Sequence, residues 1–425
     1  MKKIVCFGPG PHFKGGIANY NTSLAKAFDK IDETEVSIVS WTQQYPAIIP
    51  RDFLDRKSKE DQLEGTGIKV HYITNYNNPA TWNATAKLIQ SLEPDIVVFQ
   101  WAIAVQGIPL GFIARKLSKN KRIKVVFDLH FVIQKEGSAL DNRFTKFGIK
   151  WACAYVVHAR QTAEQLQILF PDQRFTITKH IDNLNVNDGT PVIQLYHPVY
   201  DMFKPDPLFD KEKMKKDLGL KKHVFLFFGF IRKYKGLHQA IEAFAQLNKE
   251  RDDVSLLVVG ESFWQTLDEK KISTRIKNKL FGLAKTIFLK KQDDERNYRP
   301  LDLIDQLKLK DSVVVVNEFV PNEDVHTYFQ VSDNLILFYL TATPSGVESI
   351  GYNFSMPMLA TKVGHFTDTV KDGFNGYLAE DQDVQSMKQV MEKAIESPIN
   401  RVSVAETTRE MSWANYAKSI MGLLK

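Results

Sequence analysis

Residues 224–244, VFLFFGFIRKYKGLHQAIEAF, decide the fold. The apolar run 224–228 is typical of a buried parallel strand, and Gly229 ends it. A short basic loop with Arg232 and Lys235 follows, and apolar residues then recur at helical spacing. The stretch therefore predicts a strand, a glycine turn that carries cations, and the start of a helix.

This basic loop has the features of an anion site. A helix N-terminus presents unpaired N–H groups and the positive end of the helix dipole. Arg232 and Lys235 beside it would complete a site for a multiply charged anion, most simply a diphosphate. The alternative is a surface loop that is basic without binding anything, and this stretch alone leaves the two interpretations evenly balanced.

Composition indicates a soluble globular protein with two domains. The chain has 425 residues, of which 44% are hydrophobic and 25% charged. Its two cysteines, Cys6 and Cys153, lie in apolar strand-like surroundings, so we expect both to be buried and reduced in a cytoplasmic protein. No apolar run approaches the ~20 residues of a transmembrane helix, and the N-terminal run is too short for a signal peptide.

The first half of the chain alternates strand-like and helix-like segments. Such alternation predicts a parallel sheet covered by helices on both faces, with ligands at the carboxyl ends of the strands. The strand-like runs are 4–7, 36–41, 68–73, 96–100, 123–128, 155–158 and 192–196. The helix-like segments are 17–28, 81–92, 108–117, 143–153 and 162–170.

A proline-rich segment, 197–210, interrupts this alternation and reads as a linker. A second set of strand-like runs follows it, at 225–228, 255–259, 313–316, 335–338 and 358–361. A final helix is expected over 402–424. The fold class predicted is α/β, with two facing doubly wound (Rossmann-like) domains and a cleft between them that suits a two-substrate reaction.

Glycines and a histidine are candidate ligand-binding residues of the first domain. Gly15 and Gly16 precede a predicted helix and would let a backbone approach a ligand closely, although the spacing is not that of a dinucleotide fingerprint. His130 ends a predicted strand, where it would hydrogen-bond a sugar hydroxyl or serve a structural role. Glu136 is a weaker candidate on the same loop.

A second anion cradle is predicted near residue 345. Ser345 is a candidate N-cap, which leaves free N–H groups at Gly346 and Val347. Glu348 lies in the first turn, where it would accept hydrogen bonds from ribose hydroxyls or only make a favourable contact with the helix dipole.

An ordered set of motifs resembles the retaining glycosyltransferases of family four. The motifs are GGIANY (15–20), DLHFVIQKE (128–136), YHPVYDMF (196–203), FFGFIRKYKGL (227–237), LLVVGESFW (256–264), FVPNEDVHTYFQVSD (319–333), TATPSGV (341–347) and MPMLATKVGHFTDTVKDGFNGYLAED (356–381). The resemblance implies the GT-B fold, with an acceptor domain over 1–197, a donor domain over 205–405 and a crossover helix over 406–425 that returns to the first domain.

The same resemblance implies roles for the candidate residues. Arg232 and Lys235 would hold the diphosphate of a nucleotide-sugar donor and stabilise the charge that develops on it, with Gly229 beside them. Gly16 would lie against the donor, and His130 against its sugar. Transfer would proceed with retention by same-face attack and would need neither a metal nor another cofactor.

The chain departs from the family pattern at two glutamates. Most members carry a pair eight positions apart, and the aligned positions here are Ala342 and Ile350. The Thr-rich turn TATPSG resembles a variant branch in which the turn replaces the first glutamate, and Glu348 could partly replace the second. A non-catalytic paralogue that binds a nucleotide or glycan is therefore the alternative to a sugar transferase of polysaccharide or lipopolysaccharide synthesis.

A basic segment over 270–291 lies within an apparent insertion, 265–295. It holds eight Lys or Arg and no acid, including Lys277, Lys279 and Lys285, whereas the whole chain has a net charge of +6. Its apolar residues fall on one helical face, which suits an anionic membrane surface near a lipid-linked or other glycan acceptor. A core-packed helix with a solvated basic face is the alternative. Nucleic-acid binding is not expected, because few aromatics are interleaved with the charges.

Overall fold

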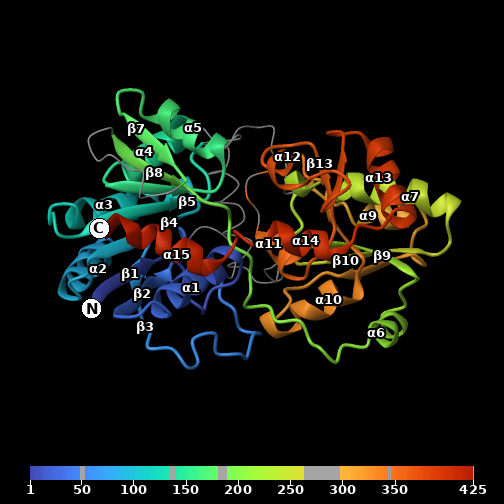
Figure 1. The fold of residues 1–425 in the computed structure, drawn as a ribbon, viewed down its shortest axis with the longest axis horizontal. Helices are drawn as coiled ribbons and strands as arrows, with labels where there is room; N and C mark the ends of the chain where they lie inside the picture. Colours follow the sequence, from blue (N-terminus) through green and yellow to red (C-terminus); the bar gives the residue numbers. More distant parts are fainter. Residues whose placement is uncertain are drawn as a thin grey trace.

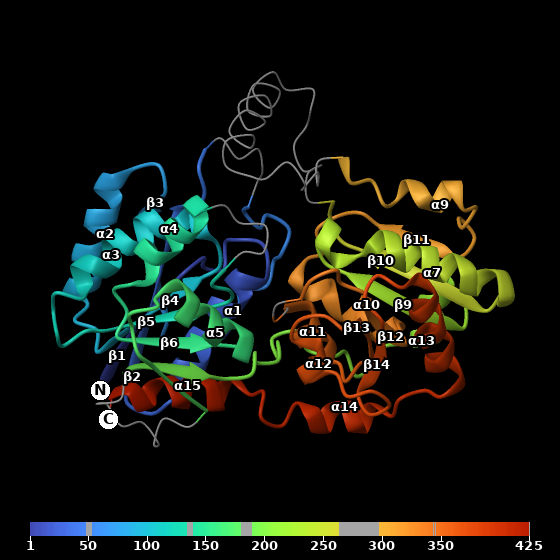
Figure 2. The same cartoon turned by 90° about the horizontal axis from the view of Figure 1, so that it is seen from above.

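The computed structural model describes residues 1–47, 53–133, 139–179, 189–262, 297–342, 344 and 346–424. They form two α/β units placed side by side, joined by the segment that follows residue 194 and by the C-terminal helices (Figures 1 and 2). All strand pairs within the two sheets are parallel. The predicted fold class is thereby confirmed.

The first sheet has eight strands in the order β3-β2-β1-β4-β5-β6-β8-β7. Its strands are β1 (Lys2–Phe7), β2 (Thr34–Gln43), β3 (Lys69–Asn75), β4 (Ile96–Trp101), β5 (Lys124–Leu129), β6 (Ala154–Val157), β7 (Phe175–Thr178) and β8 (Thr190–Gln194). Its helices are α1 (Gly16–Asp29), α2 (Pro79–Ser91), α3 (Gly107–Leu117), α4 (Ala139–Ile149) and α5 (Arg160–Leu169).

The second sheet has six strands in the order β11-β10-β9-β12-β13-β14. Its strands are β9 (His223–Phe228), β10 (Val254–Val259), β11 (Val313–Val316), β12 (Asn334–Leu337), β13 (Met358–Thr361) and β14 (Gly376–Ala379). The helices from the linker onward are α6 (Lys211–Asp217), α7 (Leu237–Glu250), α9 (Asp302–Gln306), α10 (Val325–Val331), α11 (Gly346–Asn353), α12 (Phe366–Thr369), α13 (Val384–Glu396), α14 (Arg401–Thr407) and α15 (Trp413–Met421).

The strand order places a topological switch point in each sheet. Successive strands add outward on one side up to β3 or β11, and the chain then crosses to the other side through β4 or β12. The switch points therefore lie between β1 and β4, and between β9 and β12. Ligands of open parallel sheets bind at the carboxyl ends of the strands at such points. The glycine loop after β1 and the basic loop after β9 both occupy these positions.

The C-terminal helices return to the first domain. Helix α15 packs on α1, and Tyr416 of α15 reaches Asp128 at the end of β5 (Figure 2). One apolar core is continuous across the junction and includes Tyr20, Tyr200 and Trp413. Trp413 and Tyr416 therefore hold α15 on the first unit through buried contacts with Tyr20 and Asp128.

The predicted single helix over 402–424 is wrong, because the structure has two helices, α14 and α15, with a break between them. The Ser412 side chain accepts a hydrogen bond from the backbone N–H of Asn415 over 3.2 Å and so caps a new helix. Serine at this position satisfies an otherwise unpaired donor, which favours a fresh start over a continuous helix.

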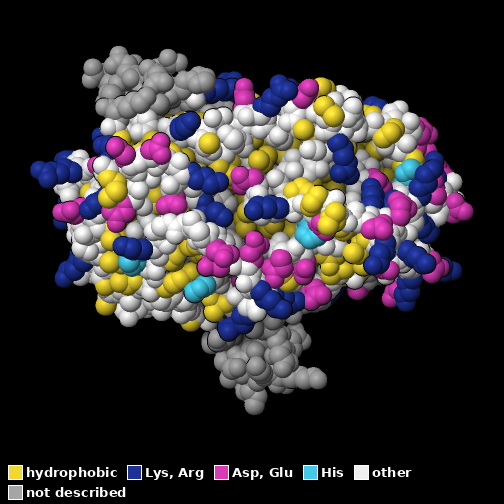
Figure 3. Space-filling model, turned by 60° about the horizontal axis from the view of Figure 1, so that its bottom comes forward, with side chains coloured by type: hydrophobic (Ala, Val, Ile, Leu, Met, Phe, Trp, Pro, Cys, Tyr) yellow, Lys and Arg dark blue, Asp and Glu magenta, His cyan; other side chains and the backbone are white. Residues whose placement is uncertain are grey.

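Two further observations concern the surface. Cys6 is buried as expected, but Cys153 is exposed, because it lies just before the first residue of β6 and not within the strand. On the face at the bottom of Figure 1, acidic and basic side chains are intermixed (Figure 3). Among the residues that the structure describes, no helix has the length and apolar character needed to cross a membrane.

Candidate functional site

The basic loop after β9 is shaped by two left-handed glycines. Gly229 has φ +90° and ends the strand, and Gly236 has φ +66° and immediately precedes α7. Between them lies a 3-10 turn, Lys233–Lys235. L-residues with a side chain rarely adopt such φ values, so the glycines allow the chain to turn within eight residues. The turn brings the side chain of Lys235 back over the end of β9.

Lys235 is the most buried cation of this loop. Its side chain is only 5% exposed, and Nζ donates a hydrogen bond to the carbonyl oxygen of Phe228 over 3.4 Å. Burial, with the nearby charge of Arg232, lowers the pKa of the ammonium from 10.5 to about 7. Arg232 itself lies with its guanidinium 5.1 Å from the ring centre of Tyr234. An arriving dianion would offset the desolvation of Lys235 and restore its charge.

The second predicted cradle meets the first one. A Cβ added at Gly229 would lie 2.8 Å from Lys235 Nζ and 3.1 Å from Val347 Cγ2. Leu340, in the loop after β12, donates its backbone N–H to the carbonyl oxygen of Tyr234 over 2.7 Å. The basic loop and the N-terminus of α11 therefore form one continuous surface at the switch point of the second sheet. Sequence reasoning predicted both parts but not that they touch.

The glycine loop of the first domain faces this surface. Gly15 has φ +100°, and a Cβ added there would lie 3.7 Å from the ring of Phe230 in the basic loop. The Tyr200 hydroxyl donates to the carbonyl oxygen of Gly16 over 2.7 Å, and a Cβ added at Gly346 would lie 3.0 Å from the Tyr200 ring. Tyr200 of the linker therefore joins the starts of α1 and α11.

Glu348 is held within the second domain. Its side chain is 4% exposed; one carboxylate oxygen contacts His365 Nε2, and the other accepts from Thr369 Oγ1 over 2.6 Å. Both oxygens therefore have protein partners, so a ribose contact would require one of them to be displaced. His365 was not singled out from the sequence as a candidate.

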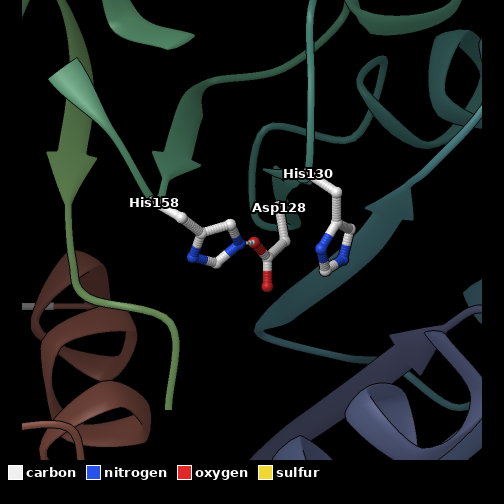
Figure 4. A group of neighbouring side chains, drawn as sticks. All are labelled: Asp128, His130 and His158. Atoms are coloured by element: carbon white, nitrogen blue, oxygen red, sulfur yellow. Dashed lines mark ion pairs between the residues drawn. The ribbon is translucent and has the colours of Figure 1, made fainter. Parts of the chain in front are cut away.

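His130 belongs to a buried polar cluster at the ends of β5 and β6. Its Nε2 lies 2.9 Å from Gln100 Oε1, and burial lowers the pKa of the imidazole from 6.5 to about 3. Figure 4 shows Asp128 between His130 and His158. His158 Nε2 lies 3.1 Å from Asp128 Oδ1, which also accepts the Tyr416 hydroxyl over 3.0 Å.

The charge of this cluster is governed by Asp128. Burial by itself disfavours the carboxylate, but the contact with His158, the electrostatic influence of His158 and His130, and the hydroxyl of Tyr416 outweigh it, so the net pKa of Asp128 is lowered. Among the described residues, Asp128, His130 and His158 are also the group best placed to hold a metal ion, with ligand atoms within 4.8 Å of one another. The expectation that no metal is needed stays a prediction.

Several residues that the sequence analysis proposed lie outside the described residues. They are Glu136, Ser345 and the cations Lys277, Lys279 and Lys285 of the segment 270–291. Conversely, sequence reasoning missed His158, Tyr200 and His365. The only available signal for His158 was a histidine that directly follows an apolar strand-like run, a position where packing is the more common role.

Structural comparison identifies the class of fold. The first of the similar solved structures is Anabaena HepE in complex with UDP and glucose, with a TM-score of 0.67 and 14% sequence identity; the match covers 100% of this chain and 99% of that one. Sucrose-phosphate synthase from Thermosynechococcus elongatus matches with a TM-score of 0.65 and 13% identity over 100% and 98% of the two chains. The chain therefore has the GT-B architecture.

Sequence comparison adds the family. The family model described as glycosyl transferases group 1 matches residues 209–411, which contain the basic loop and α11. This part of the chain, slightly less than half of it, is therefore similar to the glycosyl transferases group 1 family. A curated relative, D-inositol 3-phosphate glycosyltransferase of Corynebacterium urealyticum, is 23% identical over 240 residues. That alignment covers 53% of this chain and about half of the relative, 48% of its length.

Proposed function

We propose that this protein transfers a sugar from a nucleotide-diphosphate donor to an acceptor hydroxyl. The observation that carries the proposal is the convergence of Gly229, Lys235 and Val347 at the switch point of the second sheet, opposite Gly15 of the first domain. A buried ammonium next to a helix N-terminus suits a diphosphate better than a singly charged ligand. The HepE structure with UDP and glucose supports this choice of donor class.

The proposed chemistry proceeds with retention and needs no metal. The acceptor oxygen attacks the anomeric carbon on the face from which the diphosphate departs, and the diphosphate takes the electron pair of the broken C–O bond. The acceptor proton passes to an oxygen of the leaving phosphate. Arg232 and Lys235 stabilise the developing charge on the diphosphate. His130 would contact the donor sugar only through the edge of its ring that Gln100 leaves uncovered.

We further propose that this transfer contributes to the synthesis of a cell-surface glycan and that the enzyme is cytoplasmic and associates peripherally with the membrane. In this assignment the segment 270–291 contacts the anionic leaflet, and the acceptor is a glycan or a lipid-linked glycan. The motif resemblance supports the pathway, and the charge pattern of the segment supports the membrane contact.

The experiment is nucleotide release from a panel of UDP-, GDP- and ADP-sugars. Arg232→Ala and Lys235→Ala should each raise the barrier for transfer by roughly 2–4 kcal/mol, the scale for one preorganised charge-stabilising donor. Lys233→Ala, in the same loop, is the matched control and should stay near wild type. Added chelator should leave the rate unchanged. Anomeric NMR of the product would test retention.

A second candidate is a binding protein without transfer activity. It is favoured by one observation, the presence of Ala342 and Ile350 where most family members carry glutamates. Thermal stabilisation by a nucleotide with no turnover of any nucleotide sugar would support it. Neither stabilisation nor turnover would count against both candidates.

A further inference from the structure

The linker between the two domains places one buried tyrosine, Tyr200, between the two helix starts of the candidate site. The residue is only 2% exposed. Its hydroxyl donates to the carbonyl oxygen of Gly16, the first residue of α1, over 2.7 Å. Its ring lies beside Gly346, the first residue of α11, on the side of the second domain that faces the first (Figures 1 and 2). A single side chain therefore touches both halves of the candidate site.

The Tyr200 ring explains why residue 346 is a glycine. A Cβ added at Gly346 would lie 3.0 Å from Tyr200 Cε2 and 3.3 Å from the hydroxyl oxygen, so a side chain there would push the ring aside. Gly346 is not among the glycines with positive φ, so its backbone conformation does not demand glycine. The missing side chain instead allows α11 to approach the linker closely.

The linker also follows α11 beyond its first turn. His197 Nδ1 lies 2.7 Å from Ser349 Oγ, and Asn353 Nδ2 donates to the carbonyl oxygen of Phe203 over 2.6 Å. Together with Gly346, these helix residues are spaced by three and four positions, which places them on one face of α11. This face of the helix is therefore docked on the linker along its whole length.

A different part of α11 holds the helix within its own domain. Glu348 contacts His365 Nε2 and accepts a hydrogen bond from Thr369 Oγ1 over 2.6 Å, and both partners belong to the second domain. Loss of the Tyr200 hydroxyl would therefore leave the start of α11 beside Lys235. It would change how the glycine loop of the first domain is held against that surface.

We infer that Tyr200 is a positioning residue for sugar transfer, an inference that rests on the proposed function. The phosphates of the donor bind on the second domain, and the acceptor hydroxyl must meet the anomeric carbon between the two domains. Tyr200 acts on this geometry through Gly16 and α11, without contact with the reacting atoms. A misplacement of about 1 Å can lower the rate of an enzyme by about 10²-fold, so a contact that fixes the two domains in register matters for turnover.

The test compares two tyrosines that each lose one hydroxyl. Tyr200→Phe keeps the ring and removes the donor to Gly16. Its kcat for nucleotide release, from the donor sugar that wild type turns over, should fall about tenfold, while Kd for UDP stays within about twofold of wild type. Tyr377→Phe is the matched control, because Tyr377 is 3% exposed and donates to the carbonyl oxygen of Ser397 over 2.7 Å within the second domain. Both its kcat and its Kd should equal those of wild type.

A second variant keeps the test open if Tyr200→Phe does not fold. Ser349→Ala removes the hydroxyl that contacts His197 and should show the same division, with a lower kcat and an unchanged Kd for UDP. Unchanged kcat in both linker variants would overturn the inference. Equal losses of kcat in Tyr200→Phe and Tyr377→Phe would also overturn it. A raised Kd with unchanged kcat would do so too, because Tyr200 would then act on donor binding.

Hydrogen exchange supplies a readout that does not depend on turnover. In wild type, UDP should slow exchange of the backbone amides of both 227–237 and 13–20. In Tyr200→Phe it should slow only those of 227–237, and slowing of both segments would overturn the inference. This readout decides alone if wild type binds UDP without turnover. A wild type that neither binds nor releases any nucleotide would overturn the proposed function and this inference with it, whereas an active wild type with an equally active Tyr200→Phe would overturn only the inference.

Discussion

The Tyr416 hydroxyl donates a hydrogen bond to Asp128 Oδ1 over 3.0 Å, although 288 residues separate the two. Asp128 is fully buried at the end of β5, and Tyr416 comes from the last helix of the chain. The contact therefore satisfies one oxygen of a buried carboxylate and at the same time anchors α15 on the first domain.

Tyr416→Phe should destabilise the first domain by about 1.5–3 kcal/mol, the scale for a hydrogen bond to a charged group. The change leaves the ring and removes one donor to a carboxylate that water cannot reach. Denaturant unfolding followed by far-ultraviolet circular dichroism would measure it. Ser419→Ala, on the same helix, removes only a bond to the backbone of Asn415 and should cost less than about 0.5 kcal/mol. Equal losses of unfolding free energy in the two variants would show that the contact with Asp128 contributes no more stability than a hydrogen bond to the backbone.

The strands were predictable where apolar runs are long. The two strands that the sequence did not predict, β7 and β14, show where such prediction fails. Runs such as 96–100 and 224–227 are buried on both faces, so their composition alone indicates a strand. Strand β7 was missed because its four residues are only partly buried, and β14 because it is short and begins with Gly376. A local pattern could not reveal such marginal strands.

The site was predictable only in its local parts. The anion-site motif of Gly229, Arg232 and Lys235 lies within seven residues, so the sequence displays it directly. The contacts of Tyr200 with Gly16 and of His158 with Asp128 join segments 184 and 30 residues apart. Tertiary folding sets such contacts, and no spacing rule in the chain marks them in advance.

His130 should make stability depend on pH below neutrality. Its folded pKa, lowered by burial to about 3, lies below the ordinary value of 6.5. Between these values the unfolded chain binds a proton that the folded chain does not, so stability falls as pH falls through this window. His130→Gln should reduce the slope of the unfolding free energy against pH between pH 7 and 5. The reduction should correspond to at most one proton taken up on unfolding. His12→Gln, at an exposed position, is the control and should retain the wild-type slope.

Lys235 should make nucleotide binding take up a proton. Its pKa in the free protein is lowered to about 7 by burial and by Arg232, and a bound diphosphate would raise it again. Above about pH 7, Lys235 must therefore take up a proton from solution when the nucleotide binds. The affinity for the nucleotide should consequently fall as pH rises from 7 to 8. Calorimetry of UDP binding in buffers of different ionisation enthalpy would measure the uptake. Lys235→Met should abolish it and Lys233→Met should keep it; uptake that survives in Lys235→Met would assign the proton to another group.

Gly229→Ala should remove nucleotide binding. The residue has φ +90°, and the new methyl group would lie 2.8 Å from Lys235 Nζ and 3.1 Å from Val347 Cγ2, so it would push both parts of the candidate site aside. The left-handed backbone alone costs roughly 1–2 kcal/mol. Gly219→Ala is a matched control, because Gly219 has φ +68° but no atom within 4 Å of an added Cβ. Titration with UDP should therefore show loss of affinity in the first variant and none in the second.

Glu348→Gln separates a structural role from a ribose contact. The carboxylate is held by His365 and Thr369, so replacing it should lower stability by about 1–3 kcal/mol through the unsatisfied partners it leaves. If the carboxylate has only this structural role, the ratio of the affinities for UDP and its 2′-deoxy analogue should be the same in the variant as in wild type. Thr369→Val breaks the same contact from the other end without altering the carboxylate, and should also leave the ratio unchanged. A ratio that approaches one only in Glu348→Gln would show that the carboxylate leaves its protein partners to hold the ribose.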